Sequence, residues 1–439
     1  MNKSVKKAVI GLSILSISFS SYLLTETFRS KTNKFVKQEN IIEQAEKNIE
    51  KIRKGKFIIN FINKSGQPIK NTDISVNQLS HNFKFGGALS LYNDKNYDKY
   101  KEEFLSLFNY ATFETALKWK ILEPTINEYD YGWADNLLDW CKKNNIAVKG
   151  HAVLWGNKKW GLPDWLQHLD NKKVEQRIDL HIKSIMNRYK DYIKIWDIIN
   201  EPLTDEFFGN IAKDYAENAL ITARKIDPKA KLVINEFGVI HNRAKRERFY
   251  TYLNKLKEKN IPFDIIGLQA HEPVNGFFDF NEVANTLNYF GALGKEIHIT
   301  EFAVQTKNID GSYTNVAESL IQGNWNDDLQ AYYYENFYKI CFGNEHVSSI
   351  TLWALFDDRS WLLGSGLFDN YYKQKKAYFV LNNLINTKWK TKGLYKTNKE
   401  GQINFNGFFG KYSIKVEGFK TEHFINLESA NLTYNLSIE

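Results

Sequence analysis

Two glutamates stand at the ends of apolar runs a hundred positions apart, Glu201 and Glu301. Glu201 closes the run IKIWDIINE (193–201), and Glu301 lies near the end of EIHITEF (296–302). A pair of carboxyl groups can hydrolyse a glycosidic bond, with one group as the acid and the other as a nucleophile or base. Taken alone, Asn200 and Glu201 could instead cap a helix that follows the run.

Polar side chains also follow other apolar runs, which favours the chemical interpretation over the capping one. They are His151 and Trp155, Gln269 and His271, and Glu114 and Lys118. If the runs are neighbouring parallel strands, their carboxyl ends meet at one face of the fold. We expect the carboxyl groups of Glu201 and Glu301 to lie roughly 5 Å apart, the separation used in retaining glycoside hydrolysis. One must then be protonated while the other is ionised, because close like charges separate the two pKa values.

The elements that must position these side chains alternate along the chain between short apolar runs and longer amphipathic segments. Eight runs recur, at residues 84–90, 109–114, 147–155, 193–201, 231–237, 264–271, 296–302 and 348–356. Strands that are apolar on both faces and joined by helices must be parallel and covered on both sides. This pattern predicts an α/β fold, a closed (β/α)8 TIM barrel, over residues 81–388. An open doubly wound sheet is the alternative, but the first run lacks the usual G-x-G-x-x-G turn.

Both flanks of the predicted barrel carry alternating segments that are typical of short strands. Residues 56–80 precede the barrel, and residues 389–439 follow it with repeated Gly and Asn turns. Two short β segments bury little when they stand alone. We therefore expect them to pair as a small accessory β-sandwich beside the barrel.

The N-terminal residues have the pattern of an export segment. Three lysines precede an apolar run at residues 8–24, which predicts a signal peptide or an uncleaved membrane anchor within residues 1–28. Residues 29–55 are charged but carry apolar side chains at helical spacing, so we expect a tether helix or linker there. The predicted location is outside the cytoplasm, either secreted or anchored to the membrane through residues 8–24.

The composition argues against several other classes of protein. The formal charge is +8, but the lysines are spread along the chain without a basic and aromatic module, so we expect no nucleic-acid partner. No metal site is expected, because HEPVN (271–275) is not the zinc motif H-E-x-x-H. The two cysteines, Cys141 and Cys341, are predicted to be buried free thiols. We expect a monomer that needs no cofactor, since two carboxylates and water suffice.

Six motifs occur in order along the chain. They are KW (118–119), GHAVLW (150–155), WDIINEP (196–202), GLQAH (267–271), HITEF (298–302) and WALFDDRSW (353–361). In order and spacing they resemble glycoside hydrolase family 10, the endo-β-1,4-xylanases, over residues 80–388. The resemblance implies a barrel enzyme of polysaccharide degradation whose partner is β-1,4-xylan or a related glycan.

The resemblance also implies a role for each candidate residue. Glu201 would be the general acid and base, Glu301 the nucleophile, and Asn200 would hold the sugar 2-hydroxyl. The remaining implied contacts are His151, Trp155, Gln269 and His271 at the cleavage subsite, Glu114 and Lys118 one sugar further along, and Trp353 and Trp361 against the sugar rings. The chemistry of these side chains agrees with such roles, because flat aromatic faces suit the CH surfaces of sugars.

Three positions depart from the family's usual pattern. Thr115 stands where the family usually has Asn, Gly156 where it has His, and Ala303 where it has Asp, so the carboxylate expected to orient His271 is missing. The glutamate pair is kept while its surroundings differ, and two alternatives to xylan hydrolysis therefore stay open. One is the same chemistry on another β-linked glycan. The other is a membrane-tethered carbohydrate-binding protein with weak catalysis.

Overall fold

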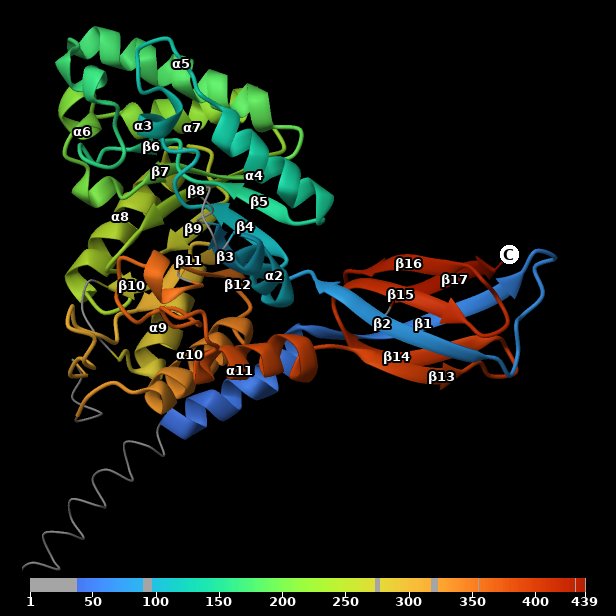
Figure 1. Cartoon of the computed structure of the whole chain (residues 1–439). Helices are drawn as coiled ribbons and strands as arrows, with labels where there is room; N and C mark the ends of the chain where they lie inside the picture. The colour runs from blue at the N-terminus through green and yellow to red at the C-terminus, as the bar shows by residue number, and fades with distance from the viewer. Residues whose placement is uncertain are drawn as a thin grey trace, which may run out of the picture.

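The protein consists of a β/α barrel with a β-sandwich beside it (Figure 1). The computed structural model describes residues 38–89, 97–272, 277–316, 323–353, 355–430 and 432–438. The predicted fold class, a (β/α)8 TIM barrel with an accessory sandwich built from the flanking segments, is confirmed.

Eight parallel strands in the described part of the chain form the barrel wall. They are β3 (Lys84–Leu89), β4 (Tyr110–Phe113), β5 (Ala147–Gly150), β7 (Ile195–Asn200), β8 (Lys231–Glu236), β9 (Ile265–Leu268), β11 (Glu296–Val304) and β12 (Val347–Leu352). Each strand pairs with the next, and β12 pairs with β3, which closes the ring. Two short strands, β6 (Leu154–Trp155) and β10 (His271–Glu272), extend the wall beside the carboxyl ends of β7 and β11. Each apolar run of the sequence overlaps one barrel strand.

The inside of the barrel is more polar than the apolar runs suggested. Tyr110, Ile195, Val233 and Ile265 form an apolar layer near the amino ends of their strands. Closer to the carboxyl ends of the strands, the buried side chains are polar. They are Thr112 in β4, Lys149 in β5, Asp197 in β7 and Asn235 in β8. The sequence predicted strands that are apolar on both faces. This prediction is wrong for the side chains that point into the barrel near the carboxyl ends of the strands.

Helices cover the outside of the barrel between successive strands (Figure 1). They are α2 (Tyr97–Leu107), α3 (Trp119–Leu122), α4 (Gly132–Lys143), α5 (Asn171–Tyr189), α6 (Phe208–Ile211), α7 (Tyr215–Ile226), α8 (Arg243–Glu258), α9 (Phe280–Gly291), α10 (Asp327–Phe342) and α11 (Lys376–Asn383). Short helical turns are η1 (Asp164–His168), η2 (Pro202–Thr204), η3 (Asp357–Arg359) and the π-helical η4 (Leu384–Lys388). Asp170, Asn242 and Asn326 cap α5, α8 and α10 by accepting a backbone N–H, which satisfies donors that a helix leaves unpaired.

The sandwich takes strands from both ends of the chain. One sheet holds β14 (Gln402–Phe408), β1 (Lys54–Asn63) and β17 (Leu432–Ile438) in that order. The other holds β13 (Lys392–Lys396), β2 (Asp73–His81), β15 (Gly410–Val416) and β16 (Glu422–Leu427). Their apolar faces meet in one buried cluster that includes Phe57, Ile59, Phe61, Val76 and Tyr412.

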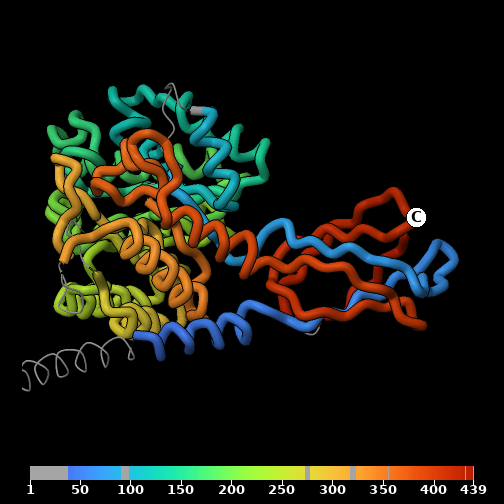
Figure 2. Tube along the Cα trace, turned by 60° about the horizontal axis from the view of Figure 1, so that its bottom comes forward, coloured from blue at the N-terminus to red at the C-terminus, as the bar shows by residue number. Residues whose placement is uncertain are grey.

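A helix at residues 38–52 lies along the barrel and leads into the sandwich (Figure 2). Its Ala45 and Ile49 are buried, and its Glu46 forms an ion pair with Lys339 of α10 at 2.9 Å. The side chain of Gln38 accepts the backbone N–H of Phe280 at 3.0 Å, at the start of α9. The helix is therefore part of the outer layer of the barrel.

The expected signal peptide or anchor at residues 1–28 lies outside the described residues. Among the residues that the structure does describe, none forms a helix of the length and apolar character needed to span a bilayer. Cys141 and Cys341 are buried free thiols, as the sequence predicted.

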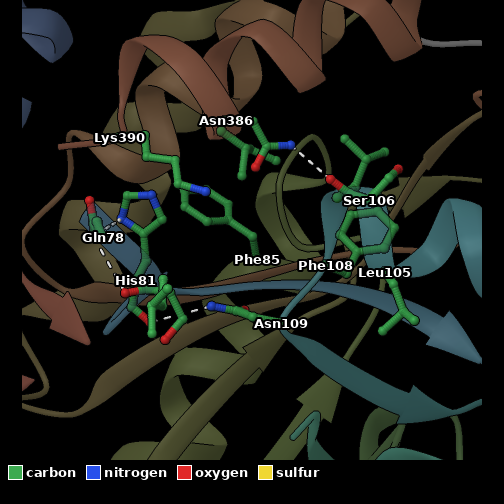
Figure 3. A pocket seen from close by; sticks show the side chains of 13 residues that line it. Gln78, His81, Phe85, Leu105, Ser106, Phe108, Asn109, Asn386 and Lys390 are labelled. Atoms are coloured by element: carbon green, nitrogen blue, oxygen red, sulfur yellow. Dashed lines mark hydrogen bonds between the residues drawn. The ribbon is translucent and has the colours of Figure 1, made fainter. Parts of the chain in front are cut away.

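An open pocket with an empty volume of about 430 Å³ lies where the sandwich meets the barrel (Figure 3). It borders the amino ends of β3 and β4, so it is at the opposite end of the barrel from the strand carboxyl ends. His81 lies between Gln78, whose Nε2 is 3.3 Å from the imidazole Nδ1, and Asn109, whose amide donates to the His81 carbonyl at 3.3 Å. Burial lowers the pKa of His81 to about 4, so its imidazole is neutral at neutral pH.

Candidate active site

Glu201 follows the last residue of β7 at the mouth of the barrel. Its φ of 57° is in the left-handed region, and its N–H donates to the carbonyl of Asn235 at 2.7 Å. Both carboxyl oxygens are held: the indole N–H of Trp155 donates to Oε2 at 2.9 Å, and the amide of Gln269 donates to Oε1 at 3.1 Å. The side chain is therefore fixed in one orientation at the open end of the barrel.

Glu301 lies within β11 and is 4% exposed. Its carboxylate accepts from the amide of Asn235 at 2.9 Å and from the imidazole Nε2 of His271 at 3.0 Å. Burial alone would raise the pKa of Glu301, but the hydrogen bond from His271 and the charges of His271, His151 and Lys149 outweigh it, and the pKa of Glu301 lies below its usual value. Glu301 is consequently ionised at neutral pH.

The two glutamates share the same two neighbours. Asn235 accepts the backbone N–H of Glu201 with its carbonyl and donates its side-chain amide to Glu301. Gln269 does the reverse: its carbonyl accepts the backbone N–H of Glu301 at 2.9 Å, and its side chain donates to Glu201. Two residues that each bond both glutamates place the carboxyl groups in a single site.

Lys118 lies beside this pair on the segment after β4. Its ammonium is 5.0 Å from the ring centre of Trp155. Burial lowers the pKa of Lys118, while the nearby carboxylates of Glu114, Glu301 and Glu201 act in the opposite direction. Because the indole of Trp155 also donates to Glu201, the contact between Lys118 and Trp155 places Lys118 at the site of the glutamate pair.

Asp197 in β7 supports the site from the barrel interior. Its Oδ2 accepts from the imidazole Nδ1 of His151 at 2.8 Å and forms an ion pair with the ammonium of Lys149, also at 2.8 Å. Burial raises the pKa of Asp197, but the charges of Lys149 and His151 more than compensate, and the pKa is lowered. This bond fixes the ring of His151, which packs edge-to-face against Trp353 at 5.3 Å between ring centres.

Asn235 is itself oriented by two further hydrogen bonds. The hydroxyl of Thr300 donates to its Oδ1 at 2.7 Å, and its Nδ2 also donates to Oδ1 of Asn200 at 2.8 Å. Because the oxygen of Asn200 is used in this way, the amide N–H groups of Asn200 are the part left for a ligand.

The two tryptophans after the last barrel strand that were predicted to contact sugar rings differ in exposure. Trp353 is 6% exposed, whereas Trp361 is 55% exposed and meets His271 edge-to-face at 5.3 Å between ring centres. Trp361 therefore offers an open aromatic face beside His271, while Trp353 is enclosed and packs against His151.

All the site residues predicted from the sequence lie at or beside the carboxyl ends of the barrel strands. Sequence reasoning missed three that hold them there, Asn235, Asp197 and Lys149. A signal existed for Asn235, because it directly precedes a glutamate near the end of the run KLVINEF, as Asn200 does in its own run. Nothing in the sequence separated Asp197 and Lys149 from ordinary polar interruptions of a strand.

Two of the departures from the family's pattern have structural consequences. Ala303 pairs with His271 in the β10–β11 register, and the Nδ1 atom of His271 is buried without a hydrogen-bond partner. A side chain at Gly156 would overlap the carboxylate of Asp205, which accepts the backbone N–H groups that open α6. A histidine at position 156 would therefore require the carboxylate of Asp205 to move from its hydrogen bonds to this loop.

The site holds the groups needed for acid–base and nucleophilic chemistry on a neutral polar ligand. Across the described ranges, no cluster of three or more His, Cys, Asp and Glu residues is arranged to hold a metal ion. The chemistry that the described site offers is that of its two carboxylates, with amide, indole and imidazole N–H groups around them.

Comparisons with known proteins point to one family. The model of the family described as Glycosyl hydrolase family 10 matches residues 75–384. The chain is 28% identical over 329 residues to the endo-1,4-beta-xylanase B of Thermotoga neapolitana, which covers 71% of this chain and 91% of that protein. It is 28% identical over 321 residues to the beta-1,4-xylanase of Dictyoglomus thermophilum, covering 68% and 87% respectively. The structure of native xylanase 10B from Thermotoga maritima has a TM-score of 0.61 at 26% identity, covering 70% of this chain and 96% of that one.

Proposed function

The chain belongs to glycosyl hydrolase family 10 and is a glycoside hydrolase, and from this premise we propose that it is an endo-1,4-β-xylanase that retains configuration at the cleaved sugar. Glu201 is the acid and base in this proposal, and Glu301 is the nucleophile. The observation that carries it is the pair of residues, Asn235 and Gln269, that each bond both glutamates. The printed names of the relatives support xylan as the substrate.

In the first step, the ionised carboxylate of Glu301 attacks the anomeric carbon of the bound sugar. The bond from that carbon to the glycosidic oxygen breaks, and Glu201 gives its proton to the departing oxygen. The lowered pKa of Glu301 supports this assignment, because the nucleophile must be ionised at neutral pH. His271 and Asn235 hold its carboxylate in place for the attack.

In the second step, Glu201 acts as a base. It takes a proton from a water molecule whose oxygen bonds to the anomeric carbon, and the bond to Glu301 breaks. Both oxygens of Glu201 are already oriented by Trp155 and Gln269, so the same carboxyl group can serve both the departing sugar and the incoming water.

The substrate in this proposal lies across the mouth of the barrel. The amide N–H groups of Asn200 face the 2-hydroxyl of the sugar at the cleavage point, where a hydrogen bond strengthens as positive charge develops on the ring. His151 completes this position, and the exposed face of Trp361 stacks on the chain. Lys118 and Glu114 hold the next sugar towards the non-reducing end.

The experiment that tests the mechanism compares wild type with Glu301→Ala on an activated aryl β-xylobioside. We expect wild type to hydrolyse it with retention of configuration, followed by nuclear magnetic resonance of the first product, and Glu301→Ala to be inactive. A 2-deoxy-2-fluoro xylobioside inactivator should label the peptide that contains Glu301. Equal rates in the two proteins would remove Glu301 from the mechanism and would favour a carbohydrate-binding protein with weak catalysis.

A polysaccharide panel tests the substrate separately. Faster release of oligosaccharides from β-1,4-xylan than from mixed-linkage glucan and other β-linked glycans supports the proposal. The reverse order would keep the two-glutamate chemistry and replace xylan. The location outside the cytoplasm also stays a proposal, which rests on the lysines and apolar run of residues 1–28 and is tested by fractionating cells that express the full chain.

A further inference from the structure

The segment at residues 156–162, here called the platform loop, follows β6 and has a defined shape. The side-chain oxygen of Asn157 accepts the backbone N–H groups of Lys159 and Trp160 at 3.0 and 2.9 Å. The carbonyl of Asn157 accepts those of Gly161 and Leu162 at 2.8 and 3.1 Å. Four hydrogen bonds to one residue make the loop a closed turn, so the side chains on it are presented in fixed positions.

The platform loop lies directly against the active site. A β-carbon on Gly161 would overlap the backbone carbonyl of Trp155, whose indole holds Glu201, so only glycine allows this approach. On its other side, the carbonyl of Gly161 accepts the backbone N–H of Lys120 at 3.1 Å. The loop is thereby placed next to the Lys118–Lys120 segment, the side of the site to which the proposed function assigns the sugars beyond the cleavage point.

Trp160 at the tip of this loop is 58% exposed. The fully buried tryptophans of the chain, such as Trp119 and Trp196, fill its core, whereas Trp160 adds little to packing. An indole held open on a closed turn beside the site presents a flat apolar face of the kind that stacks on a sugar ring.

The same tip carries two exposed lysines. The ammonium of Lys159 lies 4.6 Å from the ring centre of Trp160, and Lys158 is its neighbour. In the described part of the chain neither lysine forms an ion pair. Asp164, which follows the loop in the sequence, pairs with Lys120 at 2.7 Å, and Asp205, which Gly156 approaches, accepts backbone N–H groups at the start of α6. The tip is therefore a basic aromatic surface without a counter-ion of its own.

We propose that Trp160, Lys158 and Lys159 form a distal subsite for an acidic xylan. Trp160 stacks on a sugar of the main chain beyond the one held by Lys118, and the two lysines bind the carboxylate of a uronic acid branch on it. The inference rests on the proposed function and specifies its substrate class, a xylan substituted with uronic acid.

The test measures kcat/KM on three substrates: an aryl β-xylobioside, linear xylohexaose and a glucuronoxylan. Trp160→Ala should lower kcat/KM roughly five- to tenfold on the two long substrates, through KM, with a smaller effect on the short one. Lys158→Gln/Lys159→Gln should lower it about fivefold on glucuronoxylan alone, and the loss should shrink as salt screens the charge.

Two matched controls separate these effects from surface changes in general. Phe424→Ala removes an aromatic side chain that is 59% exposed on β16 of the sandwich, and should change no rate. Lys142→Gln/Lys143→Gln removes the same charge from the end of α4, at the other end of the barrel, and should behave like wild type.

The outcomes are distinguishable. Unchanged kinetics of Trp160→Ala on xylohexaose would overturn the subsite, and equal losses of the lysine variant on neutral and acidic xylan would overturn the role of the carboxylate. Failure of wild type to cleave any of the three substrates would overturn the proposed function itself, and the distal subsite with it.

Discussion

At the residue scale, Glu201 combines a left-handed backbone with a side chain held at both oxygens. A non-glycine residue in that conformation costs about 1 to 2 kcal/mol, which the surrounding hydrogen bonds offset. The strained turn aims the carboxyl group across the barrel mouth instead of along the next helix, where a capping role would have placed it.

Glu201→Ala should lose about 10²- to 10⁴-fold in turnover on xylan, because the departing sugar needs a proton. On an aryl xylobioside with a good leaving group, the first step needs no acid, so the loss should be much smaller and added azide should restore part of the rate. The measurement is kcat on both substrates with and without azide. Comparable losses on both would contradict the role of Glu201 as the acid.

His271→Gln tests how Glu301 is kept ionised. The hydrogen bond from His271 is one of the causes that lower the pKa of Glu301, so its loss should raise that pKa. The acidic limb of the pH profile of kcat/KM, which reports ionisation of the free enzyme, should then move to higher pH. His168→Gln, at an exposed position, is the control and should leave the limb in place. If the acidic limb stays at the same pH in His271→Gln, then His271 does not lower the pKa of Glu301.

The sequence located the reacting residues better than the residues that hold them. Glu201 and Glu301 were predicted because polar side chains follow several of the apolar runs, and the carboxyl ends of parallel strands meet at one face of the fold. Asn235 was missed, although its bonds to both glutamates hold the site together. An amide at a strand end is as consistent with a turn as with a site, and only the closed barrel shows what it faces.

At the element scale, β5 and β7 carry an ion pair between fully enclosed groups. Lys149 and Asp197 are 1% and 0% exposed and lie 2.8 Å apart. Taking one partner away leaves the other charge buried without compensation, which is strongly destabilising.

Asp197→Asn should lower the free energy of unfolding by roughly 3 to 5 kcal/mol, measured by urea denaturation. It should also reduce activity, since the hydrogen-bond partner of His151 loses its negative charge. Asp179→Asn breaks an exposed pair with Lys183 on α5 and should cost less than about 1 kcal/mol. Equal effects of the two substitutions would show that the interior pair carries no special weight.

The strands themselves were predictable because every barrel strand overlaps an apolar run. The polar inner face was not, since strands as short as β4 (Tyr110–Phe113) and β5 (Ala147–Gly150) place only two side chains on each face. A single Lys or Asp in so short a run cannot be assigned to an inner or outer position from its spacing alone.

At the scale of the whole molecule, buried histidines link stability to pH. Burial lowers the pKa of His81 to about 4 and that of His181 to about 3. In the unfolded chain the pKa of histidine is roughly 6.5, so between these values the unfolded state binds the proton more readily. The contribution of these histidines to stability is thus fully present above about pH 6.5, and it falls as the pH drops towards their pKa values in the folded protein.

We expect the free energy of unfolding to fall by on the order of 2 to 3 kcal/mol for His81 between pH 6.5 and 4. Urea denaturation across this range measures it. His81→Gln should flatten the dependence, whereas His168→Gln at an exposed position should not. A wild-type stability that stays constant from pH 6.5 to 4 would contradict the burial of a neutral imidazole at the junction.

The accessory sandwich and the pairing of its two flanking segments were predicted from their alternating pattern, but the strand order and register were not. The parallel register of β1 with β17 and the antiparallel one with β14 join segments from opposite ends of the chain. The apolar residues at helical spacing in the charged segment 38–52 predicted a helix, but they did not indicate that it packs on α10. Both depend on contacts between distant segments, which leave no local pattern.

This joining of the two ends has a consequence for synthesis. While a nascent chain is still emerging, β1 has neither of its neighbours, because Asn60 must wait for Gln402 and Asn435. Until β14 and β17 are synthesised, the backbone of β1 is unpaired on both sides and the side chains of Phe57, Ile59 and Phe61 are uncovered. Both features favour association with other chains. A chain that ends just after the barrel would thus be prone to aggregate, and a minimal enzyme made by removing the five strands β13 to β17 should also lack β1 and β2.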